Sequence, residues 1–206
     1  MRREPIIAHQ ICTAAIHSCQ SAARLQSKPP PYCHWLCGQR ITILNRPLLD
    51  SEWDLVRAFA RRLERRDITL RFGRALDLAN DSTLKQYFDI SPGVGEVAWV
   101  LDDTNAITGV SHRITVSHSE AEIALIVRSD LKRLGIGEFL LRQMLVRSAQ
   151  DGLSTLSASV FQENRPMLKL VDKIGYVPRQ TSAWTVEVIF ELSRPTTLAD
   201  HSQDRS

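Results

Sequence analysis

The chain has 206 residues, of which 43% are hydrophobic and 24% are charged. These proportions are typical of a globular domain with a sizeable core, and no apolar run approaches the roughly 18 residues of a membrane-spanning helix. The net charge is only +3, and residues 1–40 alone carry five basic side chains against one acidic one. The remainder is therefore nearly neutral. This excludes the clustered basic face of a dedicated nucleic-acid-binding protein and predicts neither a nucleic-acid nor a membrane partner.

Residues 1–39 are expected to form an N-terminal extension that is disordered or serves as a linker. The segment contains few acids, and its three consecutive prolines, Pro29 to Pro31, impose an extended backbone. All four cysteines lie in it, at spacings that match no zinc-binding pattern, so we expect no metal site. The composition is also compatible with an organellar transit peptide. The apolar stretch of a secretory signal is missing, however, and we expect a cytoplasmic protein.

The folded domain is expected to span residues 40–192, followed by a polar, disordered tail over 193–206. The predicted strands, in which β-branched and apolar residues cluster between turn residues, are 40–48, 96–101, 106–114, 121–127, 155–160 and 183–192. The predicted helices, in which apolar residues recur at helical spacing, are 50–66, 74–88, 136–150 and 163–174. This order predicts an α/β fold: a central mixed β-sheet with helices on both faces.

In two of these elements the sequence pattern predicts which residues share a face. The helix 50–66 begins with Ser51 as a predicted N-cap. Its inward face is predicted to consist of Trp53, Val56, Phe59, Ala60 and Leu63. The strand 121–127 alternates, so that Ala121, Ile123, Leu125 and Val127 share one face while Glu122 lies on the other with Ala124 and Ile126.

A basic turn with two glycines joins the strand 121–127 to the helix 136–150. Its sequence is Lys132-Arg133-Leu134-Gly135-Ile136-Gly137. Packing does not explain these glycines, because a glycine at a helix start costs about 1 kcal/mol relative to alanine. Bare backbone N–H groups at the positive end of a helix dipole bind phosphate groups, and the turn is therefore predicted to bind an anion. A Rossmann dinucleotide site is not expected, because Leu140 stands where the third glycine would be.

The turn and its position resemble the GNAT superfamily of N-acetyltransferases over about residues 41–192. The family motif, [Q/R]-x-x-G-x-[G/A], is matched by the turn with lysine in place of arginine or glutamine at Lys132. A second family element, an asparagine followed by a helix and Gly-Tyr, appears as "NRPMLKLVDKIGY". More narrowly, "AEIALIVRSDLKRLGIG", "ENRPML" and "TLRFG" are similar to the acetyltransferase domain of bacterial protein-lysine acetyltransferases. The resemblance implies a GNAT-like fold and acetyl-CoA as co-substrate, without a metal.

The resemblance also implies how coenzyme A is held. The turn would bind its pyrophosphate, and the preceding strand would splay from its neighbour so that backbone groups reach the pantetheine arm. Asn164 is expected to cap the following helix, to contact the coenzyme arm, or to do both. The implied coenzyme-binding residues are Ile126, Val127, Lys132, Arg133, Leu134, Gly135, Ile136, Gly137 and Asn164.

Glu122 is the candidate catalytic base, because the acceptor amine must lose a proton before it attacks the thioester. The competing interpretation is a solvated strand residue; Glu120 is the reserve candidate, and His118 is expected on the surface. Many family members carry a tyrosine seven residues after the motif asparagine, where this chain has Val171. Tyr176 is expected in the core, which leaves no evident acid for the departing thiolate.

The expected function is transfer of an acetyl group from acetyl-CoA to an amine by direct attack in a ternary complex. The predicted core contains no cysteine for a covalent intermediate, which fits direct attack. A protein lysine is the first expected acceptor and a small-molecule amine the second. The alternative of another class is a non-catalytic, acyl-CoA-binding regulatory domain. Four arginines, Arg65, Arg66, Arg71 and Arg74, are interpreted as a solvated charge cluster or as part of an acceptor site.

Overall fold

The computed structural model describes residues 32–36, 39–43, 50–88, 95–102 and 104–192. The expected C-terminal tail, most of the expected N-terminal extension, and Cys12, Cys19 and Cys37 lie outside the described residues. The strands are β1 (Tyr32–Leu36), β2 (Gln39–Ile43), β3 (Gly95–Leu101), β4 (Ile107–Thr115), β5 (Glu120–Val127), β6 (Thr155–Phe161), β7 (Val177–Thr181) and β8 (Thr185–Glu191). The helices are α1 (Trp53–Ala60), α2 (Arg65–Phe72), α3 (Asp81–Phe88), α4 (Ile136–Gln150) and α5 (Arg165–Ile174).

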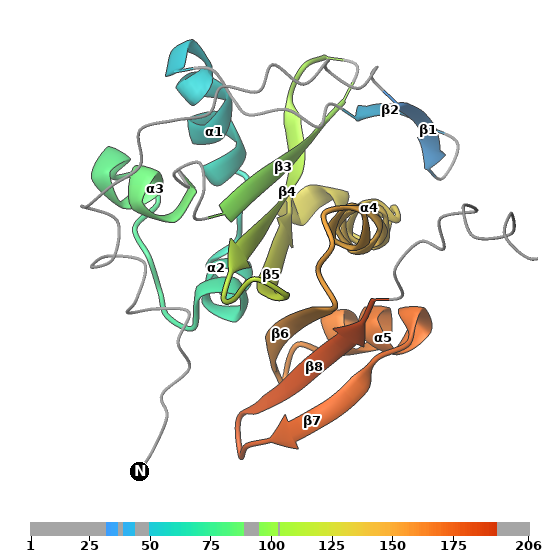
Figure 1. The fold of residues 1–206 in the computed structure, drawn as a ribbon. Helices are drawn as coiled ribbons and strands as arrows, with labels where there is room; N and C mark the ends of the chain where they lie inside the picture. The colour runs from blue at the N-terminus through green and yellow to red at the C-terminus, as the bar shows by residue number, and fades with distance from the viewer. Residues whose placement is uncertain (1–31, 37–38, 44–49, 89–94, 103, 193–206) are drawn as a thin grey trace, which may run out of the picture.

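Six strands form one mixed sheet in the order β3-β4-β5-β6-β8-β7, and β1 pairs with β2 in a separate hairpin (Figure 1). Every neighbouring pair in the large sheet is antiparallel except β5 and β6, which are parallel. The connection between those two parallel strands is α4, which is the usual way that a chain returns to start a parallel neighbour.

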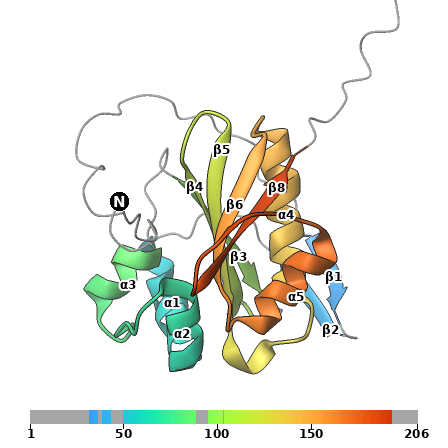
Figure 2. The ribbon, with the colours of Figure 1, turned by 90° about the horizontal axis from the view of Figure 1, so that it is seen from below.

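Helices cover both faces of the sheet, as the sequence predicts (Figure 2). The first three helices pack on one face through a core that includes Phe59, Phe72 and Phe88. The other two pack on the opposite face through a core that includes Leu141 and Val171. The alternation predicted for β5 is confirmed, because Ile123 belongs to the second core and Ile126 to the first. None of the described helices is long and apolar enough to cross a membrane.

The pairing between β5 and β6 stops early. Its register comprises Glu120 with Thr155, Ala121 with Leu156, and Glu122 with Ser157, although β5 continues to Val127 and β6 to Phe161. The two strands therefore splay beyond Glu122, and over residues 123–127 the edge of β5 that faces β6 pairs with no described strand. The splay that the family resemblance implied is present, and it begins earlier along the strand than Ile126.

The predicted helix 50–66 is wrong in its extent. Residues 50–52 form a 3-10 turn, and α1 ends at Ala60. The N-cap is Glu52 rather than Ser51, and its side chain makes no capping hydrogen bond. The chain tightens after α1, because the N–H of Leu63 donates to the carbonyl of Ala60, and a second helix, α2, begins at Arg65. The predicted inward face is nevertheless confirmed: Val56, Phe59, Ala60 and Leu63 are buried and Trp53 packs against them.

The other predicted elements are compared with the structure by their bounds and their number. Only residues 81–88 of the predicted helix 74–88 are helical, and this helix begins after Asn80, whose side chain accepts hydrogen bonds from the N–H groups of Ser82 and Thr83. Two strands are additional: β1, which lies inside the expected extension, and β7, which contains Pro178. A proline is tolerated in β7 because this strand is the edge of the sheet. The predicted helix 136–150 coincides with α4.

Candidate active site

The turn between β5 and α4 presents a row of unpaired backbone donors. Arg133 and Gly135 both have left-handed backbone conformations, with φ of 66° and 87°. In the part of the chain that the structure describes, the backbone N–H groups from Lys132 to Glu138 have no hydrogen-bond acceptor. Successive unpaired N–H groups in a turn with left-handed residues can make a concave anion-binding site. The start of the α4 dipole adds positive potential there, so these residues fit a phosphate group.

The two glycines of this turn have different roles. Gly135 is the N-cap of α4 in a left-handed conformation, which glycine adopts at no steric cost. Gly137 has no such conformation, and a Cβ there would lie 3.6 Å from Leu170 and 3.7 Å from Val127, which are ordinary contacts. Only Gly135 is therefore required by the backbone, and alanine would fit at position 137, as the family motif permits.

The two basic side chains of the turn differ in whether they have an ion-pair partner among the described residues. The ammonium group of Lys132 forms an ion pair with Asp67 of α2, so its charge is already compensated within the protein. Arg133 is exposed and has no ion-pair partner among the described residues. The free positive charge at this turn is therefore that of Arg133, together with the backbone N–H groups.

Glu122 lies where β5 and β6 begin to separate. It forms the last pair of their parallel register, opposite Ser157. Its side chain is mostly buried on the same face of the sheet as the first three helices, and burial raises the pKa of its carboxyl group above the ordinary value. The positive charge of Arg71 opposes this rise in pKa, and the negative charge of Glu187 adds to it. A carboxylate with a raised pKa at this position is suited to accept a proton near neutral pH.

Arg71 and His112 form the polar surroundings of Glu122. A terminal nitrogen of Arg71 donates a hydrogen bond of 3.3 Å to Nδ1 of His112, which is 1% exposed. Because arginine can only donate, His112 must carry its proton on Nε2. Burial, together with the nearby charge of Arg71, holds the pKa of His112 well below its usual value, so the ring is neutral. Burial also lowers the pKa of Arg71 to about 10, while Glu122 acts in the opposite direction.

This polar group is incompletely satisfied. Nε of Arg71 and Nε2 of His112 are both buried and have no hydrogen-bond partner in the described part of the chain. Buried donors of this kind are uncommon, because each one loses its hydrogen bond to water without replacement. The register places His112 beside Ala124 and therefore one step along the face from Glu122. Charge and unsatisfied donors thus gather beside the splayed strands.

The reserve candidate Glu120 and the expected surface residue His118 lie outside this buried group. Glu120 and His118 are exposed at the start of β5 and in the preceding turn. Arg65 and Arg66 are exposed, as expected for a solvated charge cluster, while Arg74 donates a hydrogen bond of 2.6 Å to the hydroxyl of Tyr87. Of the four clustered arginines, only Arg71 reaches the interior beside Glu122.

Asn164 is the N-cap of α5. Its side-chain oxygen accepts a hydrogen bond of 3.3 Å from the N–H of Met167, which confirms the capping prediction. Val171, at the position of the family tyrosine, is fully buried in the core between α5 and the sheet. The coenzyme contact expected for Asn164 stays a prediction.

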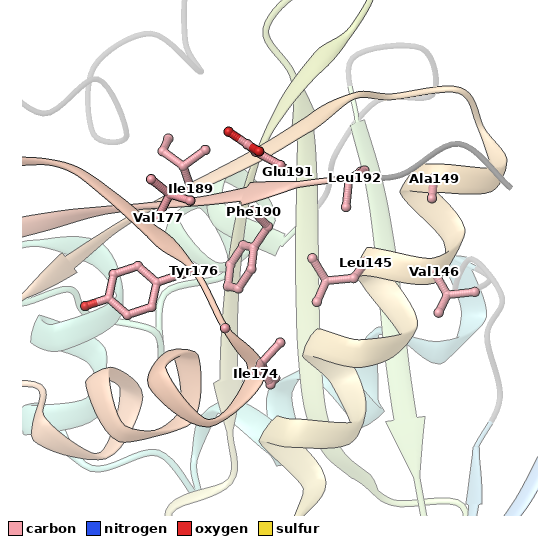
Figure 3. Close-up of a pocket in the computed structure, with 11 residues that line it drawn as sticks. Leu145, Val146, Ala149, Ile174, Tyr176, Val177, Ile189, Phe190, Glu191 and Leu192 are labelled. Atoms are coloured by element: carbon pink, nitrogen blue, oxygen red, sulfur yellow. The ribbon is translucent and has the colours of Figure 1, made fainter.

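An apolar groove lies at the end of α4 farthest from the anion-binding turn (Figure 3). It runs between this helix and β7 and β8, and its lining includes Leu145, Phe190 and Tyr176. Tyr176 is partly buried and packs against the second core. Glu191 is the one carboxylate among the lining residues, so the groove lacks the combination of donors and base found at the splay. Among the described residues no group of three or more His, Cys, Asp or Glu side chains could hold a metal ion.

The sequence alone did not single out Arg71, His112 or Asp67 as contributors to this site. Arg71 belongs to a basic cluster, and nothing in its spacing singles it out from Arg65, Arg66 and Arg74. Asp67 lies beside these arginines in the sequence, whereas in the structure it pairs with Lys132, which is 65 positions away. Contacts between residues so far apart leave no periodic signal in a single sequence.

Comparison with known proteins identifies the family and the fold. The model of the acetyltransferase (GNAT) family matches residues 63–176, which is more than half of the chain. The crystal structure of the GNAT domain of S. lividans PAT is 17% identical and has a TM-score of 0.71, covering 81% of this chain and 100% of that one. The spermidine N-acetyltransferase from Vibrio cholerae, solved in complex with CoA and spermine, is 16% identical and has a TM-score of 0.61, covering 74% and 96%.

A GCN5-related N-acetyltransferase from Kribbella flavida, 16% identical, gives a TM-score of 0.60 over 73% of this chain and 98% of that one. At these identities the solved structures establish the fold, and the family match establishes the membership. The chain belongs to the acetyltransferase (GNAT) family and is an acetyl-CoA-dependent N-acetyltransferase.

Proposed function

We propose that this protein transfers the acetyl group of acetyl-CoA to the ε-amine of a protein lysine, with Glu122 as the general base. The observation that carries this proposal is a juxtaposition. The unpaired N–H groups of residues 132–138 and the unpaired edge of β5 adjoin a mostly buried carboxylate at the start of the splay. One end of this arrangement suits a diphosphate, and the other suits an amine that must lose a proton.

The coenzyme would bind along the splay. The backbone N–H groups of Lys132 through Gly137 would hold its diphosphate, and the side chain of Arg133 would add a positive charge. The backbone of Ile126 and Val127 would pair with the pantetheine arm as a further strand would, because this edge of β5 has no described strand against it. Asn164 caps α5, which packs beside α4, and would approach the arm from the other side.

The reaction would proceed by direct attack. Glu122 accepts a proton from the acceptor ammonium group, directly or through one water, and leaves a neutral amine. The amine nitrogen bonds to the acetyl carbon, and a backbone N–H of β5 stabilises the negative charge that develops on the thioester oxygen. The carbon–sulfur bond then breaks, the nitrogen of the new amide releases its excess proton to water, and the coenzyme leaves as a thiolate. Since Val171 cannot donate a proton, the thiolate takes its proton from solvent.

The proposed acceptor is a protein lysine. A protein lysine is favoured by the sequence likeness of "AEIALIVRSDLKRLGIG" and "ENRPML" to acetyltransferase domains that act on protein lysines. A small polyamine is the second candidate, since the fold is shared with a spermidine N-acetyltransferase. Glu122 and Glu187 lie near each other on this face and would attract a cationic amine of either kind.

The proposal is tested in two steps on the full chain. Calorimetry with acetyl-CoA should show one-site binding, and a thiol-release assay should then show turnover. The assay compares a panel of lysine-containing peptides with spermidine and with an amino sugar at equal concentration. Faster turnover with peptides supports the lysine acceptor, and faster turnover with spermidine assigns the enzyme to small amines. Coenzyme binding without turnover on any amine would contradict the proposal.

A further inference from the structure

A buried carboxylate connects α2 to the anion-binding turn. Asp67 lies in the first turn of α2 and is 9% exposed. One of its oxygens accepts a hydrogen bond of 2.5 Å from the hydroxyl of Ser129, and the other forms the ion pair with Lys132. Both partners belong to the segment that connects β5 to the unpaired N–H groups. Asp67 therefore holds this segment at two points.

Neighbouring contacts reinforce the same attachment. The hydroxyl of Ser129 accepts a hydrogen bond of 2.8 Å from the N–H of Glu64, and the N–H of Ser129 donates to the carbonyl of Arg62 at 3.2 Å. The side chain of Arg62 also reaches Asp130 at 3.2 Å, in an exposed ion pair of small energetic value. The segment before the anion-binding turn is thus docked against the junction between α1 and α2.

Asp67 would be unfavourable beside a diphosphate if its charge were not compensated. Its two partners supply that compensation: a hydroxyl donor and a cation. A buried carboxylate with both oxygens occupied is stable, and it becomes costly when one partner is removed. The charge of Lys132 is therefore used within the protein, which leaves the backbone N–H groups and Arg133 to meet the diphosphate.

We infer that Asp67 is a positioning residue for the coenzyme site: through Ser129 and Lys132 it holds the β5–α4 turn in the conformation that presents its N–H groups to a diphosphate. The inference rests on the proposed function. Its opposite is an arrangement in which Lys132 leaves Asp67 and contacts the diphosphate directly. The two arrangements predict opposite effects for Asp67→Asn. In the first, the substitution loosens the turn and weakens coenzyme binding, whereas in the second it releases Lys132 and strengthens binding.

The test is calorimetric binding of coenzyme A to the full-length protein and its variants. Asp67→Asn is expected to weaken binding at least tenfold, and Lys132→Met to weaken it to a similar degree. The double variant should bind coenzyme A no more weakly than the single variant with the lower affinity, because both substitutions remove the same interaction. Asp81→Asn is the matched control, because Asp81 pairs with Arg57 in an ion pair distant in sequence from the turn, and binding should be unchanged.

Two further measurements separate positioning from a loss of folding. Circular dichroism shows whether Asp67→Asn is folded; if it is not, Ser129→Ala replaces it, since it removes one of the two attachments and should weaken binding by a smaller factor. With S-acetylpantetheine, which lacks the diphosphate, kcat/KM should be the same for wild type and Asp67→Asn. An equal loss with both thioesters would indicate a general structural defect and overturn the inference.

Equal or tighter binding of coenzyme A by folded Asp67→Asn would also overturn the inference, as would a much larger loss for Lys132→Met than for Asp67→Asn. These outcomes would leave the proposed function intact. Failure of the wild-type protein to bind coenzyme A would instead contradict the proposed function itself.

Discussion

Glu122 and Ser157 face each other in the last pair of the parallel register between β5 and β6. Beyond this pair the two strands separate, so a carboxylate stands at the vertex of the splay. A substrate that entered between the strands would end beside Glu122, where burial makes the carboxylate more basic than an exposed glutamate. This single relationship places the proposed base at the inner end of the proposed coenzyme channel.

Replacing Glu122 by glutamine should separate binding from catalysis. Glutamine has the same shape but cannot take a proton, so turnover should fall by about 10²–10⁴-fold, the usual contribution of a general base. Calorimetric affinity for acetyl-CoA should be unchanged, because the diphosphate would bind at the other end of the site. Glu120→Gln, an exposed change on the same strand, is the control and should retain full turnover. A fully active Glu122→Gln variant would exclude Glu122 as the base.

The pH dependence of kcat/KM should depend on Arg71. Only ionised Glu122 can accept a proton, so activity should rise with pH through its raised pKa. Arg71 opposes the rise in that pKa, so Arg71→Gln should move the ascending limb of the profile to higher pH. The same acceptor amine is used for every variant, so the protonation of that amine affects all the pH profiles equally. Arg71→Lys keeps the positive charge, so its ascending limb should lie between those of Arg71→Gln and the wild type.

Arg74→Gln is the matched control for this experiment, since it removes an exposed arginine near the end of the same helix. Its profile should coincide with that of the wild type. If Arg71→Gln left the ascending limb in place, or moved it to lower pH, the assignment of Arg71 as the charge that sets the basicity of Glu122 would be wrong.

The same carboxylate should reduce the stability of the folded protein at high pH. Its pKa is raised in the folded state, so ionisation is less favourable there than in the unfolded chain. Stability is therefore lost as the pH rises from the ordinary glutamate pKa through the raised value. Glu122→Gln, which resembles the protonated form, should have a higher Tm than the wild type at pH 8. The two melting temperatures should converge near pH 4, and a constant difference at both pH values would contradict this explanation.

The two glycines of the turn should respond differently to alanine. Gly135→Ala forces a side chain into a left-handed conformation and should cost about 1–2 kcal/mol of unfolding free energy. Gly137→Ala should be neutral or stabilising by up to about 1 kcal/mol, because its Cβ meets only ordinary contacts and alanine favours a helix. Denaturant unfolding of the two variants measures both effects. Equal destabilisation by the two substitutions would show that the left-handed conformation is not the reason why position 135 requires glycine.

Local sequence patterns predicted the elements that depend on residues close together in the chain. The bounds of α4, the hairpin of β3 and β4, and the cap at Asn164 were predicted from periodicity, turn residues and capping chemistry. These signals lie within a few residues of the feature that they specify. The glycine-containing turn was likewise identified from its position between a strand and a helix.

Tertiary contacts decided the features that the sequence did not predict. The break between α1 and α2 is stabilised by Ser129, which accepts a hydrogen bond from the N–H of Glu64 across 65 positions. The strand β7 forms despite Pro178 because it lies at the sheet edge, and sheet order is a property of the whole fold.

The sequence by itself determined the family, the strand–turn–helix that presents N–H groups, and the identity of the candidate base. These follow from residue types at short spacing, which act through backbone conformation and hydrogen-bonding capacity. Only the tertiary structure decided which groups surround these residues: Asp67 pairs with Lys132, and Arg71 lies with the neutral His112 beside Glu122. Electrostatic interactions depend on distance in space and on burial, and both are set only when α2 packs against the sheet.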